Sequence, residues 1–293
     1  MYPASFEYLA PSGISEAIEL LKQHGDDAKL LAGGQSLVPM MKLRVARPKF
    51  LIDIHRLPEL QYIREEAGHI CCGAMTRHVE IEESSLLREK IPTLCEAASK
   101  IGDTQVRNRG TIGGGLVEAD PAGDYGPIAL ALNAKLKCVG PKGERIIAAE
   151  DFFTFAYTTV LESDEILTEV IFPTPDRSSA GVYLKLERVA GDFAIASAAV
   201  QVGLDKDGAC NSTGIGVTGA GAVPQKAVSV EALLRGSKIT PVLIDQAGAL
   251  VQEGAEPIED LRGSASYKKK ALGAILRRAI AESLRRAEAK RSS

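Results

Sequence analysis

The sequence of 293 residues contains no tryptophan, and only 5% of its residues are aromatic. It also lacks any apolar run approaching the ~18 to 20 residues that a membrane-spanning helix needs. The opening segment MYPASFEYLAPSG has neither the basic start nor the apolar stretch of a signal peptide, so we expect a cytoplasmic protein without a membrane span. Hydrophobic residues at 45% and charged residues at 25% are ordinary for a globular protein, which disfavours disordered and disulfide-scaffold classes.

Cysteine and histidine are also scarce, with five and four residues. The cysteines are Cys71, Cys72, Cys95, Cys138 and Cys210. Their number is odd and no pair has the CxxC spacing, so we expect reduced thiols and neither an iron–sulfur nor a structural zinc site. No HExxH pair occurs among the histidines, and we expect no metal in this chain.

The net charge of -3 conceals an uneven distribution. Residues 266–293 hold nine Lys or Arg against two Glu, so this tail carries +7 and the rest of the chain −10. An acidic body disfavours nucleic-acid binding. In the tail, Leu272, Leu276, Ala279, Ile280 and Leu284 share one helical face. The face with Lys268 to Lys270, Arg277, Arg278, Arg285 and Arg286 is expected to be solvated, with docking onto an acidic partner as an alternative.

The periodicity of the first 55 residues predicts one α/β unit. It consists of a strand at 6–9, a helix from about 14 to Gly25, a buried strand at 29–32, a turn at 33–36, a helix at 37–43 and a strand at 50–54. Gly25 suits the left-handed residue that follows a helix.

A second unit follows, and together the pattern indicates a mixed α+β fold. We expect strands near Tyr62, Ile70, 136 and 166–172, helices around Val79, Leu94 and 125–132, and a loop over 102–115. The segment PTPDRSS at 173–179 disfavours both helix and strand and predicts a domain boundary. After it, strands at 182–187, 194–202 and 212–218 precede helices, which predicts a small antiparallel sheet backed by helices.

Two glycine clusters carry the most specific chemical signal. They are Ala32-Gly33-Gly34-Gln35-Ser36-Leu37 and Thr111-Ile112-Gly113-Gly114-Gly115, each after an apolar run. Without Cβ atoms, backbone N–H groups in such loops can approach phosphates closely, and a helix start adds positive partial charge. One such cluster alone is more often a tight turn, but two within one α+β region indicate a dinucleotide.

Two other glycine patterns do not fit the motifs that they resemble. The segment Gly214 to Gly219 reads G-x-G-x-x-G, but no helix opens there and residues 238–244 contain no acid, so we interpret it as a glycine-containing strand. The segment GQSLV at 34–38 ends in Val38 where a nucleophile elbow needs glycine, which disfavours a serine hydrolase.

The segments AGGQSLVPMMKLR and RNRGTIGGGLVEADPAGDYGPIALAL together resemble the FAD-binding medium subunits of molybdenum hydroxylases. This family includes the carbon monoxide dehydrogenase medium chain and the flavin domain of xanthine dehydrogenase. The resemblance covers nearly the whole chain. It implies a two-part FAD-binding domain of the PCMH type at 1–177, with subdomains at about 1–55 and 56–177, and a small C-terminal domain of antiparallel sheet plus helices at 178–293.

The resemblance also implies particular site residues. Ala32 to Ser36, with Leu37 beside them, and Thr111 to Gly115 match the loops that hold the FAD pyrophosphate. Asp124 matches an aspartate that hydrogen-bonds the cofactor, although it is also placed to cap the following helix. Ile101, Leu167 and Lys185 match positions that line the flavin, and Phe193 matches an aromatic position over its ring. The plainer alternatives are that Lys185 faces water and Phe193 belongs to a core. Lys185 is expected to favour reduced anionic flavin by its charge.

The sequence departs from the family pattern at two positions. Gly115 stands where the xanthine dehydrogenase pattern TIGGN has Asn, so a contact is lost or taken over, with Glu118 as the candidate replacement. Gln35 replaces a residue that is often His in carbon monoxide dehydrogenases, which argues mildly against that substrate.

The family's assembly defines the function that the resemblance implies. A large subunit carries the molybdenum-pterin cofactor, a small subunit carries iron–sulfur clusters, and electrons pass through FAD to an external acceptor. The resemblance implies that the assembly is a dimer of heterotrimers. Two alternatives stay open. One is a self-contained FAD-dependent reductase of the UDP-N-acetylenolpyruvoylglucosamine reductase type, and the other is a scaffold subunit without a cofactor.

Overall fold

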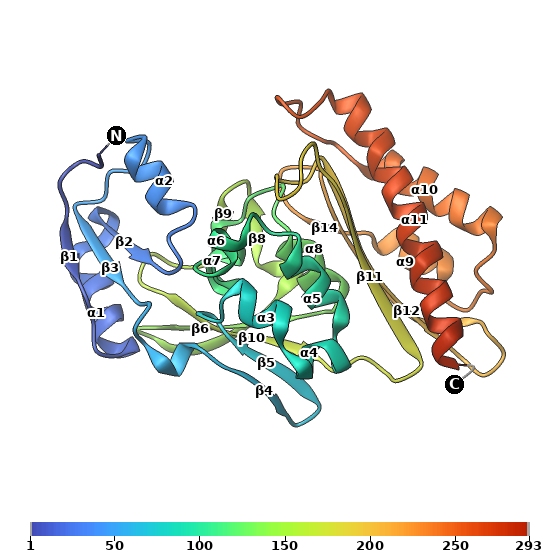
Figure 1. Cartoon of the computed structure of the whole chain (residues 1–293), viewed down its shortest axis with the longest axis horizontal. Coiled ribbons are helices and arrows are strands. Elements are labelled where there is room, and N and C mark those ends of the chain that lie inside the picture. The colour runs from blue at the N-terminus through green and yellow to red at the C-terminus, as the bar shows by residue number, and fades with distance from the viewer. Residues whose placement is uncertain (1, 292–293) are drawn as a thin grey trace.

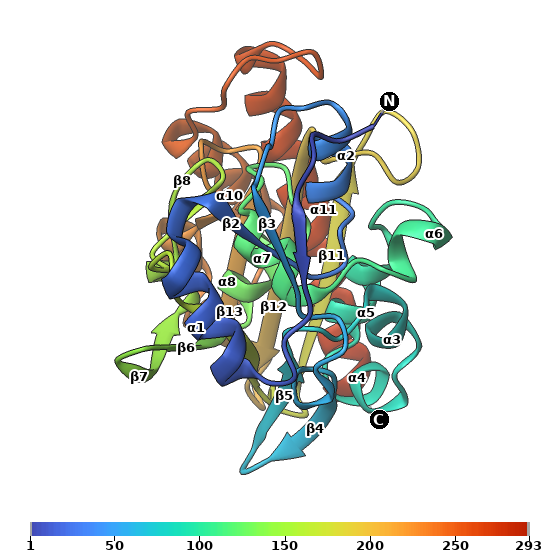
Figure 2. The same cartoon turned by 90° about the vertical axis from the view of Figure 1, so that its left-hand side faces the viewer.

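The computed structural model of the chain describes residues 2–291. Its chain forms three successive parts, which Figure 1 shows in order from the N-terminal unit in blue to the C-terminal helices in red. Figure 2 shows the N-terminal unit in front of the other two parts. Each part buries an apolar cluster of its own.

The N-terminal unit is a small parallel sheet covered by one helix. Its elements are β1 (Glu7–Leu9), α1 (Ile14–His24), a 3-10 turn at Gly25–Asp27, β2 (Ala28–Leu31), α2 (Leu37–Lys42) and β3 (Phe50–Asp53). The strand order is β1-β3-β2, with both pairs parallel. Helix α1 buries Ala17, Ile18 and Leu21 in the core of this unit, as the helical spacing predicts. Gly25 ends the helix with a φ of +50°, a conformation that favours glycine.

The prediction of a buried strand at residues 29–32 is only partly right. Ala28 is buried, but Lys29 is exposed and Leu30 and Leu31 are half-buried. The reason is topological, because β2 lies at the edge of a three-stranded sheet rather than at its centre. Its carboxyl end leads directly into the first glycine loop, where it contributes to the central cavity described below.

The middle part is an antiparallel sheet packed against short helices. Its strands are β4 (Ile63–Glu66), β5 (His69–Gly73), β6 (Lys135–Gly140), β7 (Gly143–Ala148) and β10 (Ile166–Pro173), with a small pair β8 (Phe153–Phe155) and β9 (Thr158–Thr159). Its helices are α3 (His78–Glu83), α4 (Ser85–Lys90), α5 (Pro92–Ser99), α6 (Thr104–Arg107), α7 (Ile112–Glu118) and α8 (Tyr125–Ala131), with 3-10 turns at Pro58–Leu60 and Ala149–Asp151. The strand order is β4-β5-β10-β6-β7.

The prediction of a continuous loop over residues 102–115 is wrong, because two helices form there. Helix α6 begins after Asp103, whose side chain accepts a hydrogen bond from the Val106 backbone N–H at 2.8 Å. Helix α7 begins after Thr111, which caps it in the same way. Three successive glycines have low helix propensity and hide α7 from pattern analysis, whereas the cap and its apolar neighbours stabilise the helix.

The C-terminal part is an antiparallel sheet between two layers of helices. It consists of β11 (Ser179–Leu186), β12 (Ala196–Leu204), β13 (Cys210–Thr218), β14 (Gln225–Lys226), α9 (Val228–Leu234), α10 (Pro241–Gly254) and α11 (Ala265–Arg291). The strands follow one another in the sheet in chain order. Helices α9, α10 and α11 form one layer, and α5 and α8 of the middle part contact the sheet as well.

The pattern Gly214 to Gly219 lies in β13 and the turn after it, which confirms its interpretation as a strand. A Cβ atom on Gly214 would lie 1.9 Å from the Ala131 carbonyl oxygen, and one on Gly216 would lie 2.0 Å from that of Pro127. These glycines therefore allow α8 to lie directly on the sheet, which joins the middle and C-terminal parts.

Helix α11 confirms the predicted apolar face, because Leu272, Leu276, Ala279 and Ile280 are buried and Leu284 packs against the same core. The predicted solvated face is only partly correct. Lys268 is buried and donates to the Ile258 carbonyl oxygen, and Arg286 forms an ion pair with Glu96 of α5 at 2.5 Å. Two residues of the basic face, Lys268 and Arg286, therefore form contacts within the fold instead of facing solvent.

Residues 174–178, between β10 and β11, form neither helix nor strand. Glu96 of α5 connects the parts of the chain on either side of this break. Its Oε2 accepts from the Tyr183 backbone N–H at 3.0 Å, and its Oε1 pairs with Arg286. Within the part of the chain that the structure describes, no helix is long and apolar enough to cross a membrane.

Candidate functional site

A cavity with a volume of about 750 Å³ lies where all three parts of the chain meet. We call it the central cavity. Its lining includes both glycine loops, the start of α8, the segment after β9 and the turn before β12. All of the predicted site residues line it except Ile112 and Lys185. The volume falls within the range of about 300 to 1,000 Å³ that is typical of ligand and cofactor sites.

The first glycine loop connects β2 to α2. A Cβ atom on Gly33 would lie 2.2 Å from the Arg109 carbonyl oxygen and 2.6 Å from Gly110 Cα. Gly33 is therefore required by the close contact between the two loops, and not only by the approach of a ligand. Gly34 has a φ of +72°, which also favours glycine.

The second glycine loop forms the first turn of α7. Thr111 Oγ1 accepts from the Gly114 backbone N–H at 3.1 Å and caps the helix. Gly113 packs against Ala74, since its Cβ would lie 2.6 Å from that side chain. Ile112 is fully buried in the core of the middle part, which explains why it does not line the cavity. The structure therefore brings Thr111, Gly113, Gly114 and Gly115 to the cavity, but not Ile112.

The departure from the family pattern at Gly115 has a structural counterpart in Tyr125. A Cβ atom at Gly115 would lie 3.1 Å from Tyr125 Cδ2, so a longer side chain there would press on that ring. The Tyr125 hydroxyl is hydrogen-bonded to His78 Nδ1 at 2.9 Å, and both residues border the cavity. Glu118 lies one helical turn after Gly115 and also borders the cavity.

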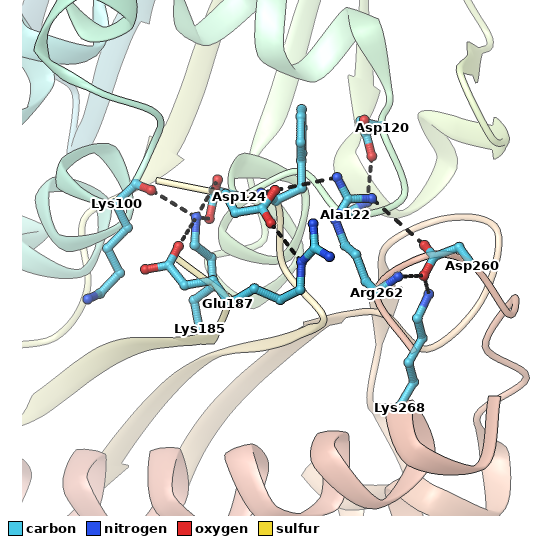
Figure 3. Close-up of polar contacts among 12 residues, drawn as sticks. Lys100, Asp120, Ala122, Asp124, Lys185, Glu187, Asp260, Arg262 and Lys268 are labelled. Carbon is cyan, nitrogen blue, oxygen red and sulfur yellow. Dashed lines mark hydrogen bonds and ion pairs between the residues drawn. The ribbon is translucent and has the colours of Figure 1, made fainter. Parts of the chain in front are cut away.

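Asp124 and Lys185 form a buried ion pair at the cavity, shown in Figure 3. Lys185 Nζ lies 3.1 Å from Asp124 Oδ1 and 3.1 Å from Glu187 Oε2, and it donates to the Lys100 carbonyl oxygen at 2.8 Å. The Lys185 side chain is only 1% exposed, so the alternative that it faces water is wrong.

The Asp124 carboxylate also accepts a hydrogen bond of 2.6 Å from the Tyr183 hydroxyl. It precedes α8 but makes no side-chain capping bond, so the alternative that it acts as a helix cap is wrong. Both oxygens are instead directed to Tyr183 and Lys185 of β11. The ion pair thus joins the floor of the cavity to the C-terminal sheet.

Three carboxyl groups border the cavity and share one electrostatic property. Burial raises the pKa of Asp124, Asp120 and Glu118 above their ordinary values, and for Glu118 the neighbouring Asp120 adds to the effect. Lys185 and Tyr183 oppose the shift at Asp124. Such carboxylates can accept hydrogen bonds from the hydroxyl groups of a ligand at the cost of desolvation.

Apolar side chains line the cavity near the C-terminal part, where the segments that hold Ile101 and Phe193 meet through Gly102 and Gly191, and Leu167 lines the cavity from β10. Leu167 is buried in β10 and Ile101 packs on the core of the middle part. Phe193 is 43% exposed, so the alternative of an ordinary core residue is wrong. This end of the cavity is suited to a flat apolar group, and the end near the glycine loops to a polar one.

Among the polar residues that line the cavity and that sequence reasoning missed are His78, Asp120, Tyr157 and Asp192. Asp120 and Tyr157 form a weak contact of 3.4 Å between Oδ2 and the hydroxyl. Asp120 stands in the same ADPAGD segment as Asp124 and was detectable there. Tyr157 and His78 carried no local signal, because the fold brings them to the cavity from distant segments.

Family models match both halves of the chain. The model described as "FAD binding domain in molybdopterin dehydrogenase" matches residues 4–175, and the one described as "CO dehydrogenase flavoprotein C-terminal domain" matches residues 181–283. The carbon monoxide dehydrogenase medium chain of Hydrogenophaga pseudoflava is 41% identical over 96% of this chain and 97% of its own length.

Two further relatives extend the comparison. The 6-hydroxypseudooxynicotine dehydrogenase complex subunit alpha of Paenarthrobacter nicotinovorans is 36% identical over 100% of this chain and 99% of its own length. A solved structure of carbon monoxide dehydrogenase from Hydrogenophaga pseudoflava that lacks the molybdenum-pyranopterin moiety contains a chain 41% identical, with a TM-score of 0.96 over 98% of this chain and 99% of that one.

The fold and the cavity therefore define a flavoprotein component of an oxidoreductase. The chain belongs to the family of FAD-binding medium subunits of molybdopterin hydroxylases, the carbon monoxide dehydrogenase medium chain family. Within residues 2–291, no group of three or more His, Cys, Asp or Glu side chains is arranged to hold a metal ion.

Proposed function

We propose that this chain passes electrons from iron–sulfur clusters of a partner subunit through FAD to an external acceptor, within a molybdenum-containing hydroxylase or dehydrogenase. The central cavity carries the proposal, because it brings two glycine loops, a buried ion pair and an apolar end together in a chain of this family. When bound, FAD supplies the redox chemistry, and the protein supplies position and electrostatic environment.

The geometry supports a role for the predicted residues that line the cavity. Residues 32–36 and 111–115 would hold the pyrophosphate, since the two loops lie against each other through Gly33 and their backbones border the cavity. Leu37, at the start of α2, would border the same part of the cofactor. Glu118, which also borders the cavity, would take over the contact that Gly115 cannot make.

The apolar end would hold the flavin ring. Ile101 and Leu167 would contact it and Phe193 would cover it, while Asp124 would accept a hydrogen bond from the cofactor. Flat apolar side chains at such a site exclude water from the ring.

Lys185 does not line the cavity, and its ammonium group is not free to face the cofactor. Its ammonium is compensated by two carboxylates, Asp124 and Glu187. The three charges sum to −1 when all are ionised, so Lys185 cannot act as an isolated cation that favours anionic reduced flavin. We propose instead that it holds Asp124 and the Lys100 carbonyl group in place next to Ile101.

The partners follow from the family and stay part of the proposal. They are a large subunit with the molybdenum-pterin cofactor and a small subunit with iron–sulfur clusters, in a dimer of heterotrimers in the cytoplasm. All five cysteines are free and buried, which supports a reducing compartment. The relatives are named for carbon monoxide and for 6-hydroxypseudooxynicotine, and we therefore propose no substrate for the complex.

Co-expression of the chain with the products of its neighbouring genes, followed by affinity purification, tests this function. We expect molybdenum, iron and FAD to purify together with the chain. The isolated chain should show weak flavin-dependent reduction of artificial acceptors and hydroxylate no organic substrate. A chain that turns over an organic substrate without partners would overturn the proposal in favour of a self-contained reductase.

A further inference from the structure

The turn between β11 and β12 forms part of the lining of the central cavity. Gly191, Asp192 and Phe193 of this turn line the cavity, and Phe193 is also 43% exposed to solvent. The Phe193 ring therefore lies at the mouth of the cavity, between its interior and the surrounding solvent. Its position decides how open that mouth is.

On one side, the turn packs against the segment that contains Ile101. Gly191 has a φ of +83°, and a Cβ atom on it would lie 2.5 Å from the Gly102 carbonyl oxygen. Arg107 Nη1 in turn donates to the carbonyl oxygens of Ile101 and Gly102 at 3.2 and 3.1 Å. This side of the turn is thus supported by backbone contacts that leave no room to shift inward.

On the other side, Arg262 of the C-terminal part contacts the turn. The guanidinium carbon of Arg262 lies 5.3 Å from the centre of the Phe193 ring, and Arg262 Nη2 lies 3.5 Å from Asp192 Oδ1. A guanidinium within about 6 Å of a ring centre is attracted to its face. Arg262 therefore contacts both residues that close the cavity.

Arg262 is itself held in place by Asp260, as Figure 3 shows. Its backbone N–H donates to Asp260 Oδ1 at 2.8 Å, and its Nη1 lies 3.8 Å from Asp260 Oδ2. Lys268, which is buried in the first turn of α11, holds the same Asp260 at 2.8 Å. A continuous set of contacts thus leads from α11 to the Phe193 ring.

The other charged groups around this contact point to a role for geometry as well as charge. Arg188 pairs with Asp192 Oδ2 at 3.4 Å but has no stacking contact with Phe193. Arg262 also lowers the pKa of Asp120, against the larger effect of burial, so it acts on a second carboxylate of the cavity. Arg188 therefore provides a control that shares the ion pair with Asp192 and lacks the ring contact.

We propose that Arg262 is a positioning residue that holds Phe193 over the mouth of the cavity and thereby limits the access of small electron acceptors to the bound cofactor. The claim that acceptor access is limited rests on the proposed function, whereas the claim that Arg262 holds Phe193 in place does not. Arg262 reaches the site from the segment between α10 and α11, so a residue of the C-terminal part would set a property of the FAD-binding part.

The first arm of the test uses the full-length chain without added cofactor. Hydrogen exchange of the backbone amides of residues 191–194 is compared in the wild type, Arg262→Ala and Arg188→Ala. We expect Arg262→Ala to accelerate exchange by about fivefold, in line with the loss of one partly exposed cation–ring contact, and Arg188→Ala to change it by less than about twofold. Equal exchange in all three would overturn the holding role.

The second arm uses the same chains loaded with FAD and photoreduced. The second-order rate constant of reoxidation by p-benzoquinone is measured, since this acceptor is neutral and insensitive to the loss of a cation. We expect a rise of about fivefold in Arg262→Ala, a smaller rise in Arg262→Lys, and less than about twofold in Arg188→Ala. The reduction potential of the flavin should stay unchanged.

A double-mutant cycle with Phe193→Ala distinguishes an effect of Arg262 through Phe193 from a general increase in the flexibility of the turn. If Arg262 acts through Phe193, the variant that lacks both side chains reoxidises no faster than Phe193→Ala alone. Additive effects, or a shifted flavin potential, would contradict the proposal. A wild-type chain that takes up no FAD would instead refute the proposed function, and the exchange experiment would still decide whether Arg262 holds the turn.

Discussion

The histidine at the cavity, His78, is buried and hydrogen-bonded to Tyr125. Burial, and to a smaller extent the positive charge of Arg107, lower the pKa of His78 to about 4. The residue is therefore neutral at pH 7, and its role is to fill the space beside Gly110 and to hold the Tyr125 hydroxyl. Burial of His78 lowers the stability of the folded chain only at acidic pH, where the unfolded chain binds a proton at this residue.

We expect His78 to make unfolding depend on pH between its unfolded pKa of about 6.5 and its folded pKa of about 4. The unfolded chain binds the proton more tightly, so stability is retained above pH 6.5 and lost as the pH falls towards 4. The loss is about 2 kcal/mol at pH 5. Urea denaturation at pH 7 and pH 5 should show that His78→Gln removes this part of the dependence. An identical pH dependence in both proteins would contradict the assignment.

Asp124 shows how one residue can join the cavity to the fold. We expect Asp124→Asn to weaken FAD binding by about 10- to 150-fold, because a charge-assisted hydrogen bond contributes about 1.5 to 3 kcal/mol. Tyr183→Phe removes only the hydroxyl bond to Asp124 and is the matched control. FAD titration by calorimetry measures the effect. A lowered melting temperature with unchanged FAD affinity would reduce Asp124 to a structural residue.

At the scale of single residues, the sequence indicated which side chains gather at the cavity but not what they contact. The aspartate of ADPAGD and the lysine of YLK were placed by resemblance, and each had a plausible alternative. The buried ion pair of Asp124 with Lys185 could not be predicted, because Asp124 lies just before α8 and Lys185 lies on β11. Such a pair is defined by tertiary structure, which residue types alone do not encode.

At the scale of elements, the clearest predictions came from strong periodicity. Helix α1 and the apolar face of α11 follow from it directly. Helix α7 does not, because its three glycines suppress the helical signal, although the Thr111 cap and the pair Ile112 and Leu116 were readable clues. The buried position of Lys268 was equally hidden, since its partner Asp260 lies in an irregular segment.

The contact between the two glycine loops gives a prediction at this scale. We expect Gly33→Ala to lower the melting temperature of the chain even without FAD, because its Cβ would lie 2.2 Å from the Arg109 carbonyl oxygen. A backbone shift of this kind costs on the order of 1 to 3 kcal/mol. Gly254→Ala is the control, since nothing lies within 4 Å of a Cβ there. Equal melting temperatures in both variants, with FAD binding lost only in Gly33→Ala, would show that the glycine serves the ligand alone.

At the scale of the whole molecule, the cavity exists only because three parts of the chain meet. The glycine-mediated contact of α8 with β13 and the bridge of Glu96 to Tyr183 and Arg286 fix the C-terminal part against the middle one. The sequence predicted two subdomains and a C-terminal domain with a boundary at 173–179, but not these contacts. Arg262 in particular lay in a segment without any motif, and only the folded chain places it beside Phe193.

The most direct test of the account is the FAD content of the purified full-length chain. We expect about one noncovalent FAD per chain, either as purified or after titration with FAD, released on denaturation as FAD and not FMN. Binding should be saturable and weakened by Asp124→Asn. A chain that stays colourless and takes up no FAD at saturating concentration would contradict the assignment of the central cavity and leave a scaffold subunit without a cofactor.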